Sequence, residues 1–196
     1  PCDMDAIGAL AHEHKLRVIE DCAQAHGARL NGFKVGSFGD VSAFSFCQDK
    51  IMSTAGEGGM FVTNDEDVWK RAWEFKDHGK SFDRMHSNHH APGFRWVHDS
   101  FGSNYRMTEI QGAIGRIQLQ RLDDWVERRR HNAARLIDGL SDLSMLRVPV
   151  PSKREYHSYY KFYAFVRRDA LKSGWSRDRV IHALDAEGVP GWSGSC

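Results

Sequence analysis

The sequence predicts an α/β fold in which short strands alternate with helices. Three observations favour this class: apolar runs of strand length lie between glycine-rich turns, runs with a helical period stand between them, and the expected helices have capping residues. The chain has 196 residues and 41% hydrophobic content. This is enough to bury a sizeable core, and it argues against disorder.

The first half of the chain contains the elements of an α/β layer. Asp3 is placed to cap a helix over residues 4–14, and "LRVIED" then reads as a strand that ends in two carboxylates. "ARLNGFKVGSFGD" carries an Asn31-Gly32 turn, which is typical of a hairpin. "VSAFSF" and "GGMFVTN" predict two further strands, and Asn64 or Asp65 is expected to cap the helix "DEDVWKRAWEFKDH" that follows.

The second half is expected to connect two domains through a long helix. Residues 80–103 are loop-like, and "NYRMTEIQGAIGRIQLQRLDDWVERRRHNAARLIDGL" is the longest helical signal. Its apolar residues form one stripe: Met107, Ile110, Ile114, Ile117, Leu122 and Trp125. After two prolines, "SYYKFYAFV" predicts a strand, "SRDRVIHALDAEG" a helix, and "VPGW" the start of a strand. We therefore assign residues 1–120 to a larger domain, and residues 121–196 to the connecting helix and part of a smaller α+β domain.

Both ends of the chain have the pattern of an internal segment. There is no initiator methionine, and the first residues form a helix of the kind that follows an earlier strand. The last residues, "GVPGWSGSC", stop within or just past an expected strand. We expect the sequence to be an internal fragment of a longer protein.

Composition argues against several classes of partner. The formal net charge is +1, so no strongly basic face for nucleic acid is required. No apolar run approaches the length of a membrane span, and no secretory signal opens the chain. The scattered cysteines contain no CxxC pair, which predicts neither a zinc site nor a disulfide framework. We expect a cytoplasmic protein that binds neither nucleic acid nor membrane.

Lys50 lies in a loop of small residues between two expected strands, "SFCQDKIMSTAGEGGMFVTN". A lysine held in a dry, crowded site has its pKa lowered and becomes a nucleophile towards carbonyls, which is the requirement for a Schiff base. An exposed loop lysine is the commoner alternative for Lys50 taken alone. The "GEGG" cluster lacks the Gly-Lys-Ser/Thr ending of a P-loop. We expect these glycines to let the backbone turn and pack closely beneath the lysine.

Three further polar residues are candidates for a site. Asp21 ends a strand, and ligands of open α/β sheets bind beyond the carboxyl ends of strands. A helix cap or a surface ion pair is the alternative for Asp21. Ser45 either binds a phosphate oxygen or is an ordinary strand serine. Asn104, just before the long helix, reads most simply as an N-cap or a turn residue.

Other polar residues near these motifs have more than one interpretation. The histidines of "RMHSNHHAPG", His86, His89 and His90, lack a regular ligand pattern and predict a solvated loop, so we expect no metal. Residues 80–103 are a candidate specificity loop. Arg106 is either a salt-bridge residue or an anion contact. His26 and Glu57 have no assigned role. His157 and Tyr159 are either substrate-side residues or half-buried aromatic residues of a strand, and the sequence fits both interpretations equally well.

Four motifs together resemble the DegT/DnrJ/EryC1/StrS family: "VIEDCAQAHGA", "VGSFGDVSAFSF", the lysine followed by "GEGG", and "GSNYRMTEIQGAIGRIQL". Members of this family are pyridoxal-phosphate-dependent aminotransferases of fold type I, known mainly for aminating sugars. The resemblance runs in order over residues 2–163 and more weakly to the end. It implies that residues 1–120 are the C-terminal half of the large α/β/α domain that binds the cofactor, followed by part of the small α+β domain.

The resemblance implies a role for each of five residues. Lys50 aligns with the lysine that forms the Schiff base, and Asp21 with the carboxylate that faces the pyridine nitrogen and keeps it protonated. Gln24 aligns with a contact on the side of the ring hydroxyl, and Ser45 with a ligand of the phosphate. Asn104 aligns with an asparagine that reaches the phosphate bound by the neighbouring subunit, which implies a homodimer with shared active sites.

The resemblance also implies the reaction. An amino acid, glutamate by analogy with the family, donates its amino group, and the keto group of a nucleotide-linked sugar accepts it. Lys50 acts as general base and acid in this transfer. The sugar-dehydrating branch of the family has histidine in place of Lys50, so the lysine favours transamination. A dehydratase or lyase, and a non-catalytic regulatory relative, are the two alternatives. The fragment alone is expected to hold the cofactor poorly, because other cofactor contacts come from earlier segments.

Overall fold

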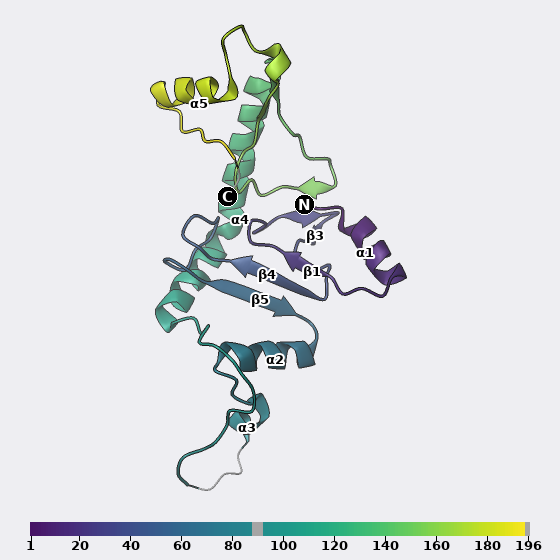
Figure 1. Cartoon of the computed structure of the whole chain (residues 1–196), viewed down its shortest axis with the longest axis vertical. Coiled ribbons are helices and arrows are strands. Elements are labelled where there is room, and N and C mark those ends of the chain that lie inside the picture. Colours follow the sequence, from purple (N-terminus) through teal and green to yellow (C-terminus); the bar gives the residue numbers. More distant parts are fainter. Residues whose placement is uncertain (88–91, 195–196) are drawn as a thin grey trace.

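The computed structural model describes residues 1–87 and 92–194, and His89 and His90 lie outside these residues. Its central sheet has three strands in the order β1-β4-β5. β1 (Ile19–Asp21) runs parallel to β4 (Val41–Ser45), and β5 (Gly59–Thr63) pairs antiparallel with β4. Helices lie around this sheet, and the predicted α/β class is confirmed (Figure 1).

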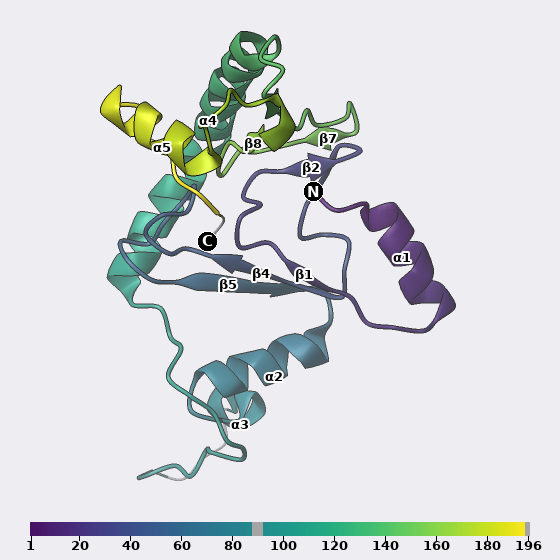
Figure 2. The same ribbon diagram turned by 45° about the horizontal axis from the view of Figure 1, so that its top comes forward.

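The register of the central sheet brings two candidate residues to one end of it. Asp21 of β1 pairs with Ala43 of β4. Ser45 lies two residues after Ala43 on β4 and pairs with Gly59 of β5. Because β1 and β4 are parallel, Asp21 and Ser45 both lie at the carboxyl ends of their strands, which point toward α4 in both views (Figures 1 and 2). The loop that contains Lys50 begins at this end, since it connects β4 to β5.

The N-terminal helix and the hairpin form as expected. α1 (Met4–Glu13) begins after Asp3, whose Oδ1 accepts a hydrogen bond from the Ala6 backbone N–H at 3.3 Å. β2 (Arg29–Leu30) and β3 (Phe33–Lys34) form the hairpin. Its two turn residues have the positive φ angles that a tight turn of this kind requires, 50° at Asn31 and 85° at Gly32. β7 (Glu155–Tyr156) adds to the outer side of β2, so the hairpin also carries a strand from late in the chain.

α2 (Glu66–Lys76) begins at Asp65, whose Oδ1 accepts from the Val68 N–H at 3.0 Å. A short helix, α3 (Phe82–His86), then interrupts the segment that we expected to be entirely loop-like. Ser81 caps it, and the ring of Phe82 packs edge-on against two tryptophan rings of α2, with centroid distances of 5.0 and 5.2 Å. The prediction of a pure loop over residues 80–103 is therefore wrong at its start, because these aromatic contacts stabilise one helical turn.

α4 (Glu109–Leu140) is the expected long helix, with 32 residues. It begins later than expected, after Thr108, whose side chain and that of Gln111 form a capping box. Of the two simple roles expected for Asn104, an N-cap or a turn residue, the N-cap is therefore wrong. The predicted apolar stripe is wrong in part, since Ile110 is 75% exposed and Val126 is 1% exposed. Two of the residues that α4 buries contact other segments: Gly115 lies against Thr54 of the Lys50 loop, and Val126 packs with Ile51 of that loop and with Tyr160 of the segment after β7.

The C-terminal part packs along the second half of α4 (Figure 2). β6 (Leu146–Arg147) pairs antiparallel with β8 (Phe165–Val166), followed by a short 3-10 helix (Arg168–Ala170) and α5 (Arg177–Ala186). Of the expected strand "SYYKFYAFV", only β8 forms. Arg129 and Arg130 of α4 bind backbone carbonyls of residues 157, 159 and 160, which draws this segment onto the helix and out of a sheet.

The expected strand at "VPGW" is absent from the described residues, while the helix before it has its predicted cap at Ser176. The expected domain division at residue 120 lies inside α4 and stays a prediction. Within residues 1–87 and 92–194, none of the helices combines the length and apolar character that a bilayer span needs.

Candidate functional site

The side chain of Lys50 is enclosed, with 13% of it exposed. Its Nζ lies 3.8 Å from Asp49 Oδ1 and 4.9 Å from the centroid of the Tyr160 ring. The Tyr160 hydroxyl donates a hydrogen bond to Asp49 Oδ2. The alternative of an exposed loop lysine is therefore wrong, and the amine sits in a small polar cage.

α4 fixes the Lys50 loop from one side. Ile51, the next residue, is buried against Val126 of α4 and Tyr160. Two glutamines of α4 bind the backbone of the loop: Gln118 Oε1 accepts from the Ser53 N–H at 2.7 Å, and Gln111 Nε2 donates to the Glu57 carbonyl at 2.8 Å. The loop backbone is thus hydrogen-bonded to a long rigid helix, which restricts where Lys50 can point.

The glycine cluster lets the loop pack closely on itself, while its expected place beneath the lysine stays a prediction. A Cβ at Gly58 would lie 2.3 Å from Thr54 Oγ1, and Thr54 is itself 1% exposed. The same Thr54 hydroxyl donates to the Glu57 carbonyl at 3.2 Å. The glycine is therefore needed for the close approach of the loop to itself.

The pKa of Lys50 departs from expectation. Burial lowers it, but Tyr160 and the carboxylate of Asp49 outweigh burial, so that the pKa lies above its usual value. The expectation of a lowered pKa is wrong for this chain because it considered only the crowded loop. The negative charge that raises the pKa comes from Asp49. Tyr160, which donates a hydrogen bond to Asp49, lies 111 residues further along the chain.

Asp21 and Ser45 present polar groups at the same end of the sheet. Asp21 is exposed, and its Oδ1 accepts from the Ala23 N–H at 3.0 Å, which shapes the turn after β1. Among the described residues it neither caps a helix nor forms an ion pair, so both plain alternatives for Asp21 are wrong there. The half-buried Ser45 accepts from the Cys47 N–H at 3.3 Å, which leaves its hydroxyl hydrogen able to donate. Gln24 is exposed in the turn that follows Asp21.

His26 is a buried residue to which the sequence assigned no role. It is 2% exposed, and its ring lies 5.7 Å from that of Phe44 and 5.9 Å from that of Phe46. Neither ring nitrogen has a hydrogen bond of normal geometry within the described structure. Burial lowers the pKa of His26, the charge of Lys50 lowers it further, and a backbone group of Ser45 opposes the shift. A neutral imidazole therefore lies between the turn after Asp21 and the Lys50 loop.

This burial predicts a loss of stability in acid. The folded-state pKa of His26 is depressed, so the unfolded chain takes up the proton first as the pH falls below about 6.5. The free energy of unfolding should therefore fall on acidification, with a contribution of at most about 1.4 kcal/mol per pH unit from one histidine.

Urea unfolding of the full-length protein between pH 7.5 and 5.5 measures this slope. His26→Gln should flatten it, and the same change at His131, which is exposed on α4, serves as the matched control. Equal slopes in the unmodified protein and in His26→Gln would contradict the assignment.

Asn104 lies apart, at the C-terminal end of α2. Its Oδ1 accepts from Arg106 Nε at 3.0 Å, and its backbone pairs with Asp77. Arg106 Nε also lies 3.5 Å from Asp77 Oδ1, so of the two roles expected for Arg106 the salt bridge is present. Asn104 is exposed there. Its contact with a neighbouring subunit stays a prediction.

The remaining candidates have local partners. His157 Nδ1 accepts from the Tyr159 N–H at 3.0 Å, and the two rings lie 4.5 Å apart. Burial lowers the pKa of His157. Both side chains are half-buried as the structural interpretation expects, but the strand expected to carry them does not form at these residues. Cys47 Sγ donates to Glu57 Oε1 at 3.4 Å, beside the Lys50 loop. In the described part of the chain, no group of three or more metal-ligating side chains comes together.

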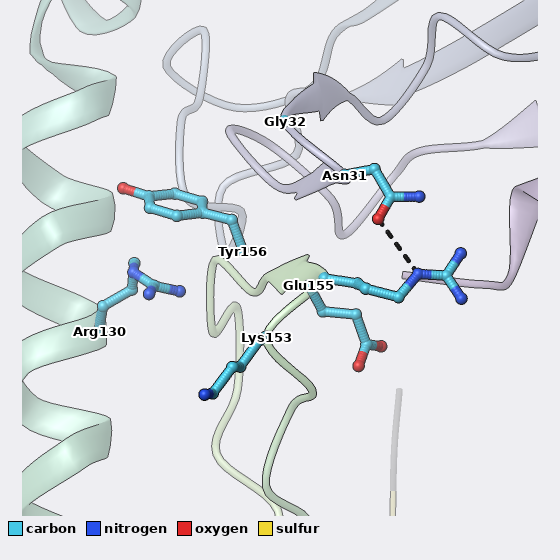
Figure 3. Close-up of a pocket in the computed structure, with 7 residues that line it drawn as sticks. Asn31, Gly32, Arg130, Lys153, Glu155 and Tyr156 are labelled. Carbon is cyan, nitrogen blue, oxygen red and sulfur yellow. Dashed lines mark hydrogen bonds between the residues drawn. The ribbon is translucent and has the colours of Figure 1, made fainter.

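A separate pocket of about 350 Å³ lies between α4, β7 and the hairpin turn (Figure 3). In it, Arg154 Nε donates to Asn31 Oδ1 at 3.1 Å, and the Arg154 guanidinium pairs with Asp5 of α1 at 2.5 Å. The guanidinium of Arg130 stacks on the Tyr156 ring at 3.9 Å. These contacts join α1, the hairpin, β7 and α4. No predicted site residue lines the pocket, so we assign it a structural role.

Comparison with known proteins identifies the family. The model of the DegT/DnrJ/EryC1/StrS aminotransferase family matches residues 1–192. The chain belongs to this family. It is 42% identical over 160 residues to the GDP-perosamine synthase of Escherichia coli O157:H7, a match that covers 82% of this chain and 40% of the relative.

Solved structures of the DegT/DnrJ/EryC1/StrS family share the fold. An aminotransferase from Psychrobacter cryohalolentis has a TM-score of 0.94 and 52% identity, over 99% of this chain and 51% of its own. An E. coli GDP-4-keto-6-deoxy-D-mannose-3-dehydratase with bound hydrated PLP has a TM-score of 0.79 and 26% identity, over 97% of this chain and 49% of its own. The chain spans about half the length of these relatives. The fold is thus part of a fold type I aminotransferase.

The residues of this site fit pyridoxal phosphate, on which the aminotransferases of the family depend. An enclosed amine suits an aldehyde, and an exposed carboxylate at a strand end suits a protonated ring nitrogen. A hydroxyl with a hydrogen left to donate suits a phosphate oxygen. All three groups come from the carboxyl ends of β1 and β4 or from the loop between β4 and β5, where open α/β sheets bind ligands.

Proposed function

We propose that the full-length protein is a pyridoxal-phosphate-dependent aminotransferase that moves an amino group from an amino acid, glutamate, to the keto group of a nucleotide-linked sugar. The observation that carries this proposal is the enclosed Lys50 amine at the end of the sheet where Asp21 and Ser45 also lie. The name of the 42% identical relative, a GDP-perosamine synthase, supports a nucleotide-linked sugar as substrate.

Each site residue then has a task. Lys50 would hold the cofactor through its aldehyde, and the Lys50 amine would move a proton to and from the substrate carbon. Asp21 holds the ring nitrogen protonated, Gln24 binds the side of the ring hydroxyl, and Ser45 donates to the phosphate. When bound, the cofactor supplies a ring that withdraws electrons from the substrate carbon. Asn104 binds the phosphate in the neighbouring subunit, so the working unit is a homodimer.

Two alternative functions are disfavoured: a dehydratase and a non-catalytic relative. A dehydratase of the same family is disfavoured because Lys50 stands where that branch has histidine, and because the 52% identical structure is an aminotransferase. A non-catalytic relative is disfavoured because a scaffold needs neither the enclosed lysine nor the carboxylate at the strand end. We place the protein in the cytoplasm, with no nucleic-acid or membrane partner.

The first test is chemical. The full-length protein is incubated with pyridoxal 5′-phosphate, reduced with borohydride, digested and analysed by peptide mass spectrometry. We expect a reduced cofactor adduct on Lys50. Tight cofactor binding without this adduct would overturn the role of Lys50, and no binding at all would favour the non-catalytic alternative.

The second test separates aminotransferase from dehydratase. Keto-sugar nucleotides are supplied with glutamate, and both the amino sugar and 2-oxoglutarate are quantified. Equal amounts of both products are expected. A deoxygenated keto product formed without consumption of glutamate would contradict transamination and support the dehydratase.

A further inference from the structure

Asp49 and Tyr160 surround the amine of Lys50 from two distant parts of the chain. Asp49 precedes Lys50 in the loop, and Tyr160 lies 111 residues further along the chain from Asp49, in the segment between β7 and β8. Tyr160 is 7% exposed, and its hydroxyl donates to one carboxylate oxygen of Asp49. The other carboxylate oxygen lies 3.8 Å from Lys50 Nζ. The same amine lies 4.9 Å from the centroid of the Tyr160 ring.

Tyr160 is the buried part of this arrangement, whereas the side chain of Asp49 is 47% exposed. Tyr160 belongs to the core cluster with Ile51 and Val126, so its ring is fixed in place. Arg129 of α4 donates to the backbone carbonyl of Tyr160 at 3.2 Å, which fixes the segment as well. The hydrogen bond from Tyr160 lowers the pKa of Asp49 below its ordinary value, which favours the charged carboxylate. A charged carboxylate and an aromatic face therefore meet one amine.

We infer that Asp49 and Tyr160 are positioning residues that hold the Lys50 amine in its cage and restrain its attack on an aldehyde. The inference rests on the proposed function only in naming the aldehyde that Lys50 attacks. The restraint of the amine by Asp49 and Tyr160 does not depend on which reaction the protein catalyses.

The titratable groups around the amine support a restraining role. Asp49 and Cys47 face it from its own loop, Tyr160 from the segment after β7, and the buried His26 from the turn after β1. Lys161 acts on Asp49, and its Nζ lies 5.1 Å from the Tyr160 ring centroid. Tyr160 and Asp49 together outweigh burial and favour the charged amine. A charged amine is not a nucleophile, so removing Asp49 should make Lys50 more reactive.

The chain offers a matched control for Asp49. Lys70 of α2 is also partly enclosed, with 31% of its side chain exposed, and Asp83 Oδ1 lies 3.8 Å from its Nζ. Asp83→Asn thus removes a carboxylate at the same distance from a different lysine. Asp49→Asn keeps the size of the side chain and removes the charge, and Tyr160→Phe keeps the ring and removes the hydroxyl.

The test uses the cofactor-free full-length protein. Trace labelling with acetic anhydride, followed by peptide mass spectrometry, gives the reactivity of each lysine from pH 7 to 11. For Asp49→Asn we expect the midpoint of Lys50 labelling at lower pH and a rate at pH 8 up to about fivefold higher. Lys70 should be unchanged. Tyr160→Phe should move the Lys50 midpoint in the same direction, and Asp83→Asn should move only Lys70.

Two outcomes would overturn the inference. One is an unchanged Lys50 profile in both Asp49→Asn and Tyr160→Phe while Asp83→Asn shifts Lys70. The other is an equal change at all lysines, which would report general loosening of the fold. Because this readout needs no cofactor and no turnover, the inference can hold even if the adduct test contradicts the proposed aminotransferase, and it can fail while that test succeeds.

Discussion

Lys50→Ala is expected to lower kcat/KM for aminotransfer by at least about 10³-fold in the full-length protein. The substitution removes both the covalent anchor of the cofactor and the group that moves the proton, and nearby side chains do not replace either. Asp49 is an anion held by Tyr160, and His26 is buried without normal hydrogen bonds. The measurement is the rate of 2-oxoglutarate formation with glutamate and an accepted keto-sugar nucleotide.

Lys70→Ala is the control for this experiment. Lys70 also forms a carboxylate pair in a partly enclosed site, so its removal tests the general cost of deleting such a lysine. We expect full activity in that variant, and loss of the borohydride-stable adduct only in Lys50→Ala. A Lys50→Ala protein that retains a tenth or more of the activity would show that another group carries the chemistry.

The elements that sequence analysis placed well are those whose signals are local. The caps of α1, α2 and α5 each have a polar side chain that binds a backbone N–H within three residues, and the hairpin turn depends on two adjacent residues. The start of α4 was misplaced, although its signal is in the sequence. Thr108 and Gln111 have the spacing of a capping box, and this pattern marks the observed start of the helix.

The elements that sequence analysis missed depend on partners far along the chain. β7 forms because Tyr156 meets Arg29 of the hairpin, and nothing near Tyr156 signals that pairing. The expected strand after it is mostly lost because arginines of α4 bind its carbonyls. Strand propensity favours a half-buried pleated surface, and this segment found a helix to pack on instead.

The candidate site shows the same difference between features with local signals and features that depend on distant partners. Asp21 and Ser45 come together because parallel strands end at one edge, which the order of the strands already indicates. The protonation of Lys50 was predicted in the wrong direction, since it depends on Tyr160 and on the aspartate that Tyr160 binds. A sequence supplies the residue types of a site, while the balance of charges around an amine requires the three-dimensional contacts.

The second large effect concerns Glu20, the other carboxylate that ends β1. Glu20 is 6% exposed, and its oxygens accept hydrogen bonds from three backbone N–H groups of the loop between β3 and β4, at Gly36 (2.8 Å), Phe38 (2.7 Å) and Gly39 (2.7 Å). Glu20→Ala leaves these donors without a partner inside the protein. We expect the free energy of unfolding to fall by about 3–5 kcal/mol, and by less in Glu20→Gln, which keeps one acceptor.

The neighbouring Asp21 provides the matched comparison for Glu20, because the two carboxylates are expected to affect different properties of the protein. Asp21 is exposed and binds only the Ala23 N–H among the described backbone groups, so Asp21→Asn should change the free energy of unfolding by less than about 0.5 kcal/mol while aminotransfer falls sharply. Urea unfolding and kcat/KM, measured on both variants, separate the two carboxylates. If Asp21→Asn destabilised the protein and Glu20→Ala spared it, the assignment of one carboxylate to the fold and its neighbour to the cofactor would be reversed. Adjacent residues of one strand point to opposite faces of the sheet, and this alternation would let two chemically similar side chains serve the loop on one side and the proposed cofactor on the other.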